Sequence, residues 1–182
     1  KALDVLGISH AETVCCETDD WIAGYAKTYG STYNVVIVSQ DSDFFQLISA
    51  KVLVLRYRGD KTALWSEHTV YQQLGVRPGQ YADFKALVGD SADNIPGAPK
   101  IGPKTAAALI SRFGSLQQIL EQTTSVEKPS IRASLEENRD QLLLNQKLIT
   151  LTGCCSLPFT PEELPQAVNF AHSHGVKVHV TV

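Results

Sequence analysis

A strand-length apolar stretch, Y-N-V-V-I-V at residues 33–38, constrains the fold of the first half of the chain more than any other segment. An apolar run of this length predicts a strand that is buried in a parallel sheet and covered by helices on both faces. Helical patterns at residues 1–6 and 19–29 and a short strand pattern near residues 11–14 precede it, and a hairpin pattern at residues 51–65 follows it. These patterns therefore predict an α/β fold with a small parallel sheet for the first half of the chain.

The pattern changes at Ser66, after which short helical stretches are separated by glycine and proline. The serine itself predicts a helix N-cap, because its side chain can accept a hydrogen bond from the first turn. We expect an α/β domain at residues 1–65 and a helical domain at residues 66–182 that ends in a proline-interrupted tail. The expected helices cover residues 66–74, 79–87, 104–113, 116–121, 131–137 and 139–148, and a short one covers residues 44–48.

The composition is typical of a globular protein outside the membrane. The chain has 182 residues, of which 43% are hydrophobic, and this is enough for one sizeable core. No apolar run approaches the roughly 18 residues that a membrane-spanning helix needs. The formal net charge is -3, so any DNA binding must use a local basic patch and not bulk charge.

The four cysteines form two adjacent pairs, Cys15-Cys16 and Cys154-Cys155. Neighbouring cysteines lack the C-x2-C spacing with which two thiolates share a zinc ion. We therefore expect buried reduced thiols and a cytoplasmic protein, and a zinc site built from both pairs is the weaker alternative.

Three groups of acidic residues lie at positions that suit a shared site. One opens the helix expected at residues 19–29, one follows the strand at residues 33–38, and one lies at a turn that begins with Gly89. The carboxyl ends of strands in α/β sheets are common ligand sites. The acidic residues are Glu17, Asp19, Asp20, Asp41, Asp43, Asp90 and Asp93.

Each acidic residue also has a purely structural interpretation. Asp19 and Asp20 suit the first turn of a helix, Asp41 suits a helix cap, and the last pair suits a turn before Pro96. Clustered carboxylates repel one another, however, and a hard cation relieves that repulsion. The spacing favours two Mg²⁺ or Mn²⁺ ions about 4 Å apart, the arrangement that serves phosphodiester hydrolysis.

The same segments resemble the motifs of a known family. The run C-E-T-D-D-W-I-A at residues 16–23 is similar to its E-A-D-D-x-I-A/G signature, and V-S-Q-D-S-D-F-F-Q-L at residues 38–47 is similar to T/S-x-D-x-D-x-x-Q-L. The run L-V-G-D-S-A-D-N-I-P-G at residues 87–97 nearly repeats G-D-x-x-D-N-I-P-G. Order and separation match as well. The chain thus resembles the 5′-3′ exonuclease and flap endonuclease family, which includes the N-terminal domain of bacterial DNA polymerase I.

This resemblance implies a PIN-like, or resolvase-like, sheet that is truncated at its N-terminus and followed by a helix-three-turn-helix subdomain. It implies that the first acidic group lines one metal site with the second group nearby, and that the third group helps to hold a second ion. The catalytic and metal-binding residues that it implicates are Glu17, Asp19, Asp20, Asp41, Asp43, Asp90 and Asp93.

A glycine-rich turn follows the third acidic group, at residues 95–106. Two helices joined by such a turn leave backbone N–H groups at the start of the second helix free to meet a phosphate, and glycine avoids a side chain that would hold the DNA away. A plain helical corner is the alternative. The resemblance instead implies a duplex-binding hairpin that often carries K⁺. The expected DNA-binding residues are Gly97, Lys100, Ile101, Gly102, Pro103, Lys104 and Thr105.

Other charged residues have weaker functional interpretations. Arg56, Arg58 and Lys61 in the hairpin suit phosphate contacts, but a surface hairpin also needs charge for solubility and edge protection. The histidines near the end, His172, His174 and His179, have no carboxylate close to them in sequence, so we interpret them as structural.

For the intact enzyme, the resemblance implies Mg²⁺-dependent hydrolysis of DNA near the 5′ ends of flaps, nicks or primed duplexes, in replication and repair. We expect a monomer that acts with a DNA polymerase domain in the same or another chain. The family's N-terminal strand with a further aspartate and its basic arch are not found here, so we expect an incomplete fragment. The alternatives are a non-catalytic duplex-binding module with a vestigial acidic site and a PIN-type ribonuclease, against which the turn after Asn94 argues.

Overall fold

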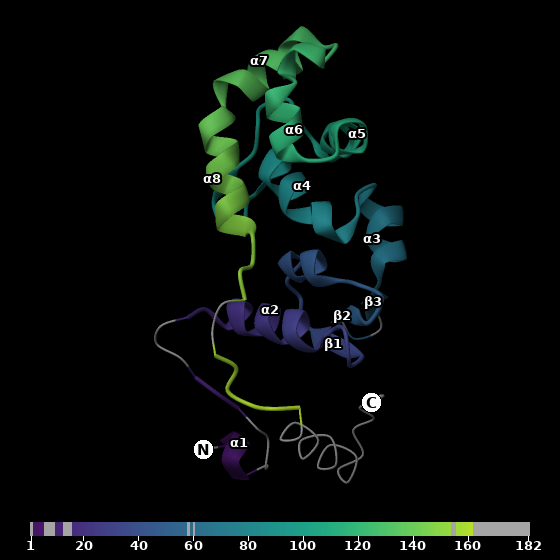
Figure 1. The fold of residues 1–182 in the computed structure, drawn as a ribbon, viewed down its shortest axis with the longest axis vertical. Coiled ribbons are helices and arrows are strands. Elements are labelled where there is room, and N and C mark those ends of the chain that lie inside the picture. The colour runs from purple at the N-terminus through teal and green to yellow at the C-terminus, as the bar shows by residue number, and fades with distance from the viewer. Residues whose placement is uncertain are drawn as a thin grey trace. The chain divides into compact units, whose positions relative to one another are not determined.

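The structure is a computed structural model that describes residues 2–5, 10–12, 16–57, 59, 61–153 and 156–161. The chain divides into two compact units, one formed by residues 1–35 with residues 152–182 and the other by residues 36–151. The domain boundary that we predict after residue 65 falls inside the second unit. Figure 1 shows the elements of both units.

The first unit contains α1 (Ala2–Val5) and α2 (Thr18–Tyr29). Both helices are confirmed at the predicted places. The strand predicted near residues 11–14 is wrong at residues 11 and 12, which form no regular element, and its remainder lies outside the described residues.

Two glycines let α2 pack closely against the segment that follows residue 151. A Cβ on Gly24 would lie 2.9 Å from Leu157 Cδ2, and a Cβ on Gly153 would lie 2.9 Å from the backbone nitrogen of Gly24. The Tyr25 hydroxyl also donates to the carbonyl oxygen of Phe159 and accepts from its N–H, both at 2.9 Å. The first unit is therefore built from segments that lie far apart in the sequence.

The second unit begins with a three-stranded sheet of order β1-β2-β3, made of β1 (Val35–Val38), β2 (Val52–Arg56) and β3 (Ala63–Trp65). β2 and β3 pair antiparallel with Val54 opposite Trp65, which confirms the predicted hairpin.

The prediction that helices cover β1 on both faces is wrong. Ile37 is buried, but Val36 is 44% exposed and Val38 is 67% exposed. β1 is an edge strand of this small sheet, and the exposure of these two valines shows that one face of the strand is open. An apolar run shows that a strand forms but not how many layers surround it.

A 3-10 helix, η1 (Asp43–Leu47), follows β1 where the sequence predicts a short helix. Phe44 and Phe45 are both only 2% exposed. The Phe45 ring stacks on Trp65 of β3 with 4.2 Å between ring centroids and meets Tyr81 edge-on. These aromatic contacts fix η1, and with it Asp43, against the sheet and the helices.

The helical part is centred on α4, which packs against α5 and α8 (Figure 1). The hydroxyl of Ser66 caps α3 as predicted, by accepting from the N–H of Thr69. The elements are α3 (Glu67–Leu74), η2 (Pro78–Gln80), α4 (Tyr81–Val88), α5 (Pro103–Phe113), α6 (Leu116–Glu121), η3 (Thr123–Ser125), α7 (Pro129–Glu137) and α8 (Arg139–Ile149). Two very short strands between α4 and α5, β4 (Gly89–Asp90) and β5 (Ile95–Pro96), pair antiparallel and are not predicted by the sequence.

Cys16 takes part in a disulfide, so the prediction of reduced thiols is wrong for this residue. Neighbouring cysteines are as compatible with a crosslink as with free thiols, and only folding brings a partner within reach. The other three cysteines lie outside the described residues. Among the helices that the structure describes, none is both long and apolar enough to cross a membrane.

Candidate metal centre and nucleic-acid interface

The loop after β1 presents Asp43 through a short chain of local hydrogen bonds. Asp41 Oδ1 accepts from the N–H of Asp43 at 2.8 Å, so Asp41 acts as a cap for η1, as its structural interpretation suggests. The Gln46 amide donates to the carbonyl oxygens of Asp43 and Ile149, at 2.9 and 3.0 Å. These bonds fix the backbone of Asp43, whose side chain is buried.

The third acidic group, Asp90 and Asp93, lies in a hairpin whose shape depends on two glycines in contact with each other. Gly89 has a φ of 87°, and a Cβ on it would lie 2.4 Å from the nitrogen of Gly97. A Cβ on Gly97 would lie 2.1 Å from the carbonyl oxygen of Val88. Only glycine fits at these positions, and the tight β4–β5 hairpin between them carries Asp90 and Asp93.

The fold brings Asp43, Asp90 and Asp93 together within the second unit. One carboxylate oxygen from each lies within 4.8 Å of the other two. Asp43 is buried, Asp90 is half-buried and Asp93 is exposed, so the group opens from the interior toward solvent. Three carboxylates this close repel one another unless a cation lies among them.

Lys85 of α4 supplies such a cation. Its ammonium lies 2.7 Å from Asp43 Oδ1 and also contacts Asp90 Oδ2. Burial acts to lower the pKa of Lys85, but its pairing with the two carboxylates outweighs burial and raises the pKa above the ordinary value. The lysine is therefore charged at neutral pH.

The two carboxylates differ in their response to this ammonium. Burial raises the pKa of Asp43, and Lys85 offsets that effect only in part. Burial also acts to raise the pKa of Asp90, but Lys85 and the N–H of Ala92 together hold that pKa below its ordinary value. Asp90 is thus more readily ionised than Asp43.

Lys85, Gln46 and Asn145 are site residues that sequence reasoning missed. Lys85 lies in the mostly apolar run A-D-F-K-A-L-V, and a lysine inside a buried helix face is itself a signal of an internal charge partner. Gln46 belongs to the second acidic motif, but nothing in the sequence shows that it bonds to Ile149. No local signal marks Asn145, which donates to the Pro96 carbonyl oxygen at 2.7 Å.

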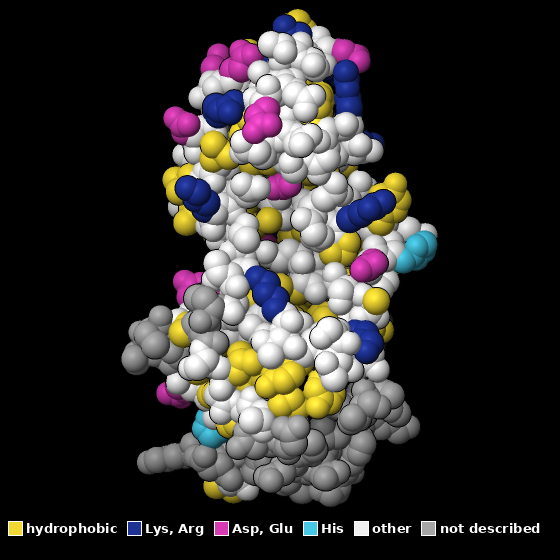
Figure 2. All heavy atoms as spheres, viewed as in Figure 1, with side chains coloured by type: hydrophobic (Ala, Val, Ile, Leu, Met, Phe, Trp, Pro, Cys, Tyr) yellow, Lys and Arg dark blue, Asp and Glu magenta, His cyan; other side chains and the backbone are white. Residues whose placement is uncertain are grey.

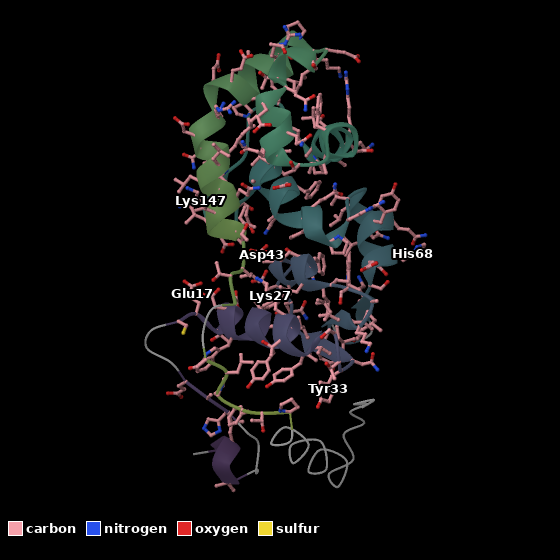
Figure 3. All side chains as sticks on the ribbon, in the orientation of Figure 1. Glu17, Lys27, Tyr33, Asp43, His68 and Lys147 are labelled. Atoms are coloured by element: carbon pink, nitrogen blue, oxygen red, sulfur yellow. The ribbon has the colours of Figure 1, made fainter. Side chains whose placement is uncertain are left out.

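The first acidic group lies in the other unit. Glu17 is the N-cap of α2, without a side-chain cap bond, and Asp19 and Asp20 form its first turn, as their structural interpretation suggests. Asp20 Oδ1 accepts from the N–H and the hydroxyl of Thr152, at 3.3 and 3.1 Å. That all three acidic groups share one site stays a prediction. Figure 3 labels Glu17 and Asp43.

The predicted DNA-binding turn joins β5 to α5. The N–H of Ala98 donates to Leu87 O at 2.9 Å, Ser134 Oγ donates to Pro99 O at 2.6 Å, and Ile101 is buried. These contacts anchor the turn on its inner side. Its tip carries Lys100, which has a φ of 66° and is exposed.

The outer side of the turn is open where α5 begins. Gly102 is the N-cap and Pro103 the first helical residue, and the first backbone bond of the helix runs from Ala106 to Gly102. The N–H groups of Lys104 and Thr105 precede that bond, in the turn of a helix where donors have no intrahelical acceptor. A Cβ on Gly102 would meet no atom within 4 Å, so internal packing does not require glycine there.

On the face shown in Figure 2, Lys and Arg are scattered singly among other residues. Arg56 is engaged within the protein, because its guanidinium donates to Gln40 O at 2.6 Å. Arg58 and the histidines His172, His174 and His179 lie outside the described residues.

Comparison with known proteins identifies the family of the chain. The family model of the 5′-3′ exonuclease C-terminal SAM fold matches residues 76–170, and that of the N-terminal resolvase-like domain matches residues 1–75. The chain belongs to the 5′-3′ exonuclease family. The predicted resemblance and the predicted fold, a resolvase-like α/β part followed by a helical part, are confirmed.

Members of the family with similar sequences include DNA polymerases. The chain is 38% identical over 150 residues to the thermostable DNA polymerase I of Thermus thermophilus, and 36% identical over 154 residues to DNA polymerase I of Bacillus subtilis. These matches cover 81% and 83% of the chain. The chain spans only 17% and 18% of the length of these two relatives.

Solved structures share the fold at lower identity. A T5 5′-exonuclease mutant matches 93% of the chain and 66% of its own length, with a TM-score of 0.73 and 24% identity. The catalytic core of Rad2 in complex with DNA matches 94% of the chain and 61% of its own length, with a TM-score of 0.55 and 17% identity. Both likenesses support the fold assignment.

Proposed function

We propose that the chain is the metal-binding and DNA-binding part of a structure-specific 5′ nuclease, which hydrolyses DNA phosphodiesters near 5′ ends in replication and repair. The proposal rests on the convergence of Asp43, Asp90 and Asp93. They are followed in the chain by a glycine-rich turn that leads into the N-terminus of α5. Membership of the 5′-3′ exonuclease family supports the proposal.

The acidic group suits hard divalent cations. Its ligand atoms are all carboxylate oxygens, and the buried Oδ1 of Asp43 lies 2.7 Å from the ammonium of Lys85. Carboxylate oxygens that attract one cation also suit a hard metal ion. We propose Mg²⁺ or Mn²⁺, two ions in all, and when bound they activate water and stabilise the leaving oxygen. The residues proposed to hold them are Glu17, Asp19, Asp20, Asp41, Asp43, Asp90 and Asp93.

The turn at residues 97–105 is proposed to bind the backbone of a branched or nicked duplex. Gly102 leaves room for a phosphate to approach the N–H groups of Lys104 and Thr105, and the helix dipole adds to the attraction. The ammonium groups of Lys100 and Lys104 contribute charge without reading sequence. A K⁺ ion on the carbonyl groups of this turn is part of the proposal.

The test, made on the full-length protein, is cleavage of an end-labelled 5′ flap substrate in Mg²⁺ and in EDTA. We expect Mg²⁺-dependent cleavage that falls by a factor of about 100 or more when Asp43 or Asp90 is replaced by Ala, because catalysis by positioning is sensitive to lost ligands. Asp140→Ala, an exposed change on α8, is the control. Cleavage that persists in EDTA or survives both site variants would contradict the proposal.

A non-catalytic duplex-binding module is the second candidate, and the position of Lys85 favours it. An ammonium that already neutralises Asp43 and Asp90 makes a metal ion dispensable for folding. Such a module binds nicked duplex equally well in EDTA and in Mg²⁺ and cleaves it in neither. Binding and cleavage measured on the same substrate separate the two candidates.

A monomeric state, a cytoplasmic location and a DNA polymerase domain as partner complete the proposal. The polymerase relatives support the last two. The disulfide at Cys16 runs against a cytoplasmic location, because reducing compartments keep most thiols free. Titration of free thiols in protein purified under nonreducing conditions tests this point.

A further inference from the structure

Lys85 contacts two of the carboxylates that the proposed function assigns to a metal ion. Its ammonium contacts Asp43 Oδ1 and Asp90 Oδ2, and all three side chains are only 10–14% exposed. Asp43 and Asp90 are also two of the three residues whose ligand atoms gather within 4.8 Å. The acidic group is thus already neutralised in part by a cation that belongs to the chain.

An ammonium and a divalent ion compete for Asp43 Oδ1 and Asp90 Oδ2. Like charges a few ångströms apart repel strongly where solvent is largely excluded. A magnesium-type ion also needs carboxylate oxygens free to complete its coordination. A metal ion that binds these two oxygens therefore displaces the ammonium from them.

Contacts other than those of the lysine also hold the two acidic residues. The backbone of Asp43 is held by Asp41 and Gln46, at 2.8 and 2.9 Å. Asp90 Oδ1 accepts from the N–H of Ala92 at 2.9 Å, within the β4–β5 hairpin. Lys85, in contrast, carries its charge on a flexible four-carbon stem.

We propose that Lys85 is a built-in placeholder cation, which neutralises Asp43 and Asp90 while metal is absent and moves off them when a divalent ion binds. The inference rests on the proposed function, because it takes the acidic group to be a metal centre. It assigns to Lys85 the role of a counter-charge, which offsets the repulsion between the two carboxylates until an ion binds.

The experiment measures Mn²⁺ binding by calorimetry, without DNA, for the wild-type protein, Lys85→Met and the control Lys147→Met. Methionine keeps the length of the stem and removes the charge. Lys147 is an exposed lysine on α8, labelled in Figure 3. We expect Lys85→Met to bind Mn²⁺ about tenfold more tightly, because the competing charge is gone, and Lys147→Met to bind like the wild type.

Thermal unfolding in EDTA and in Mn²⁺ supplies a second readout. In EDTA, Lys85→Met should unfold at a lower temperature than the wild type, and Mn²⁺ should raise its unfolding temperature by more. If Lys85→Met folds only when Mn²⁺ is present, the metal has replaced the ammonium and the proposal stands.

Equal or weaker Mn²⁺ binding by folded Lys85→Met overturns the proposal, and so does failure of this variant to fold even with Mn²⁺. Either result would make the lysine a permanent partner of the carboxylates. Since DNA is absent from the assay, a protein that binds Mn²⁺ in this way but does not cleave a flap refutes the nuclease activity and leaves the placeholder role intact.

Discussion

At the scale of single residues, Asn145 joins three segments of the second unit. Its side chain is fully buried, donates to Pro96 O at 2.7 Å and to Ala86 O at 3.3 Å, and accepts from Gln141 at 2.8 Å. It therefore ties α8 to α4 and to the hairpin that carries Asp90. A buried amide stabilises the folded state only while both its oxygen and its nitrogen have hydrogen-bond partners.

Replacing Asn145 by Ala should leave the carbonyl oxygens of Ala86 and Pro96 without this donor. We expect the free energy of unfolding to fall by about 2–4 kcal/mol, since unpaired buried polar groups and a cavity both cost stability. Urea denaturation measures the change. Leu144→Ala, at a half-exposed position on the same helix, should cost less than about 1 kcal/mol. A loss for Asn145→Ala no greater than this control would show that the hydrogen bonds contribute little.

Asp83 makes stability depend on pH. Burial raises the pKa of its carboxyl above the ordinary 3.8, although Gln146 donates to it. A raised pKa means that the folded state holds the proton more tightly than the unfolded state, so this contribution to stability is present at low pH. It is lost as the pH rises from 3.8 through the folded pKa.

Asp83→Asn should remove the loss of stability that accompanies ionisation of this carboxyl group. We expect a free energy of unfolding at neutral pH that is about 1 kcal/mol higher than in the wild type, and little difference near pH 4. Urea denaturation across this pH range, with Asp140→Asn as the exposed control, measures the effect. Lower stability of Asp83→Asn at neutral pH would show that the ionised carboxylate is the form that the fold favours.

At the scale of elements, the two ends of the turn before α5 use glycine for different reasons. Gly97 is needed by the protein itself, because any Cβ would meet the Val88 carbonyl oxygen. Gly102 has open space around it and lies in extended backbone that any residue adopts. The fold therefore requires glycine at position 97. At position 102 it does not, so a role in binding DNA can be tested there without loss of the fold.

Gly97→Ala and Gly102→Ala should separate stability from DNA binding. We expect Gly97→Ala to lower the free energy of unfolding by about 3 kcal/mol or more, as overpacking against backbone does, and Gly102→Ala to change it by less than about 1 kcal/mol. Fluorescence anisotropy should show weaker binding of nicked duplex by folded Gly102→Ala, and unchanged affinity would contradict the proposed phosphate site.

At the scale of the whole molecule, the two units are held by separate sets of contacts. α2 depends on the segment after residue 151, through Asp20 with Thr152 and through Tyr25 with Phe159. The second unit depends on its own core, in which the largest fully buried side chains include Phe44, Phe45, Leu87, Ile110, Leu116, Ile119, Leu120, Leu135 and Leu142. A change in the first set should leave the second core intact.

Gly153→Ala tests this independence. Gly153 has a φ of 64°, and a Cβ on it would press on the backbone of Gly24. Hydrogen exchange should become faster in α2 and stay the same in α4 and α8. Gly59→Ala is the matched control, because Gly59 has a φ of 57° but no neighbour within 4 Å. Faster exchange throughout the chain would mean that the units fold as one.

Much of the fold and the outline of the site follow from local patterns in the sequence. The α/β part, the helical part and the Ser66 cap depend on apolar periodicity and on hydrogen bonds within a few residues, which the sequence shows directly. The motif at residues 87–97 likewise locates Asp90 and Asp93 in a turn, because its glycines and proline limit the backbone.

Contacts between distant segments were decided only by the tertiary structure. The pairing of Lys85 with Asp43, the bonds of Gln46 and Asn145, and the exposure of Val38 all depend on which surfaces meet after folding, and no local pattern encodes that. The sequence by itself determined which carboxylates are available to a metal ion. The packing of α4 against η1 and the β4–β5 hairpin determined that three of them meet around a lysine.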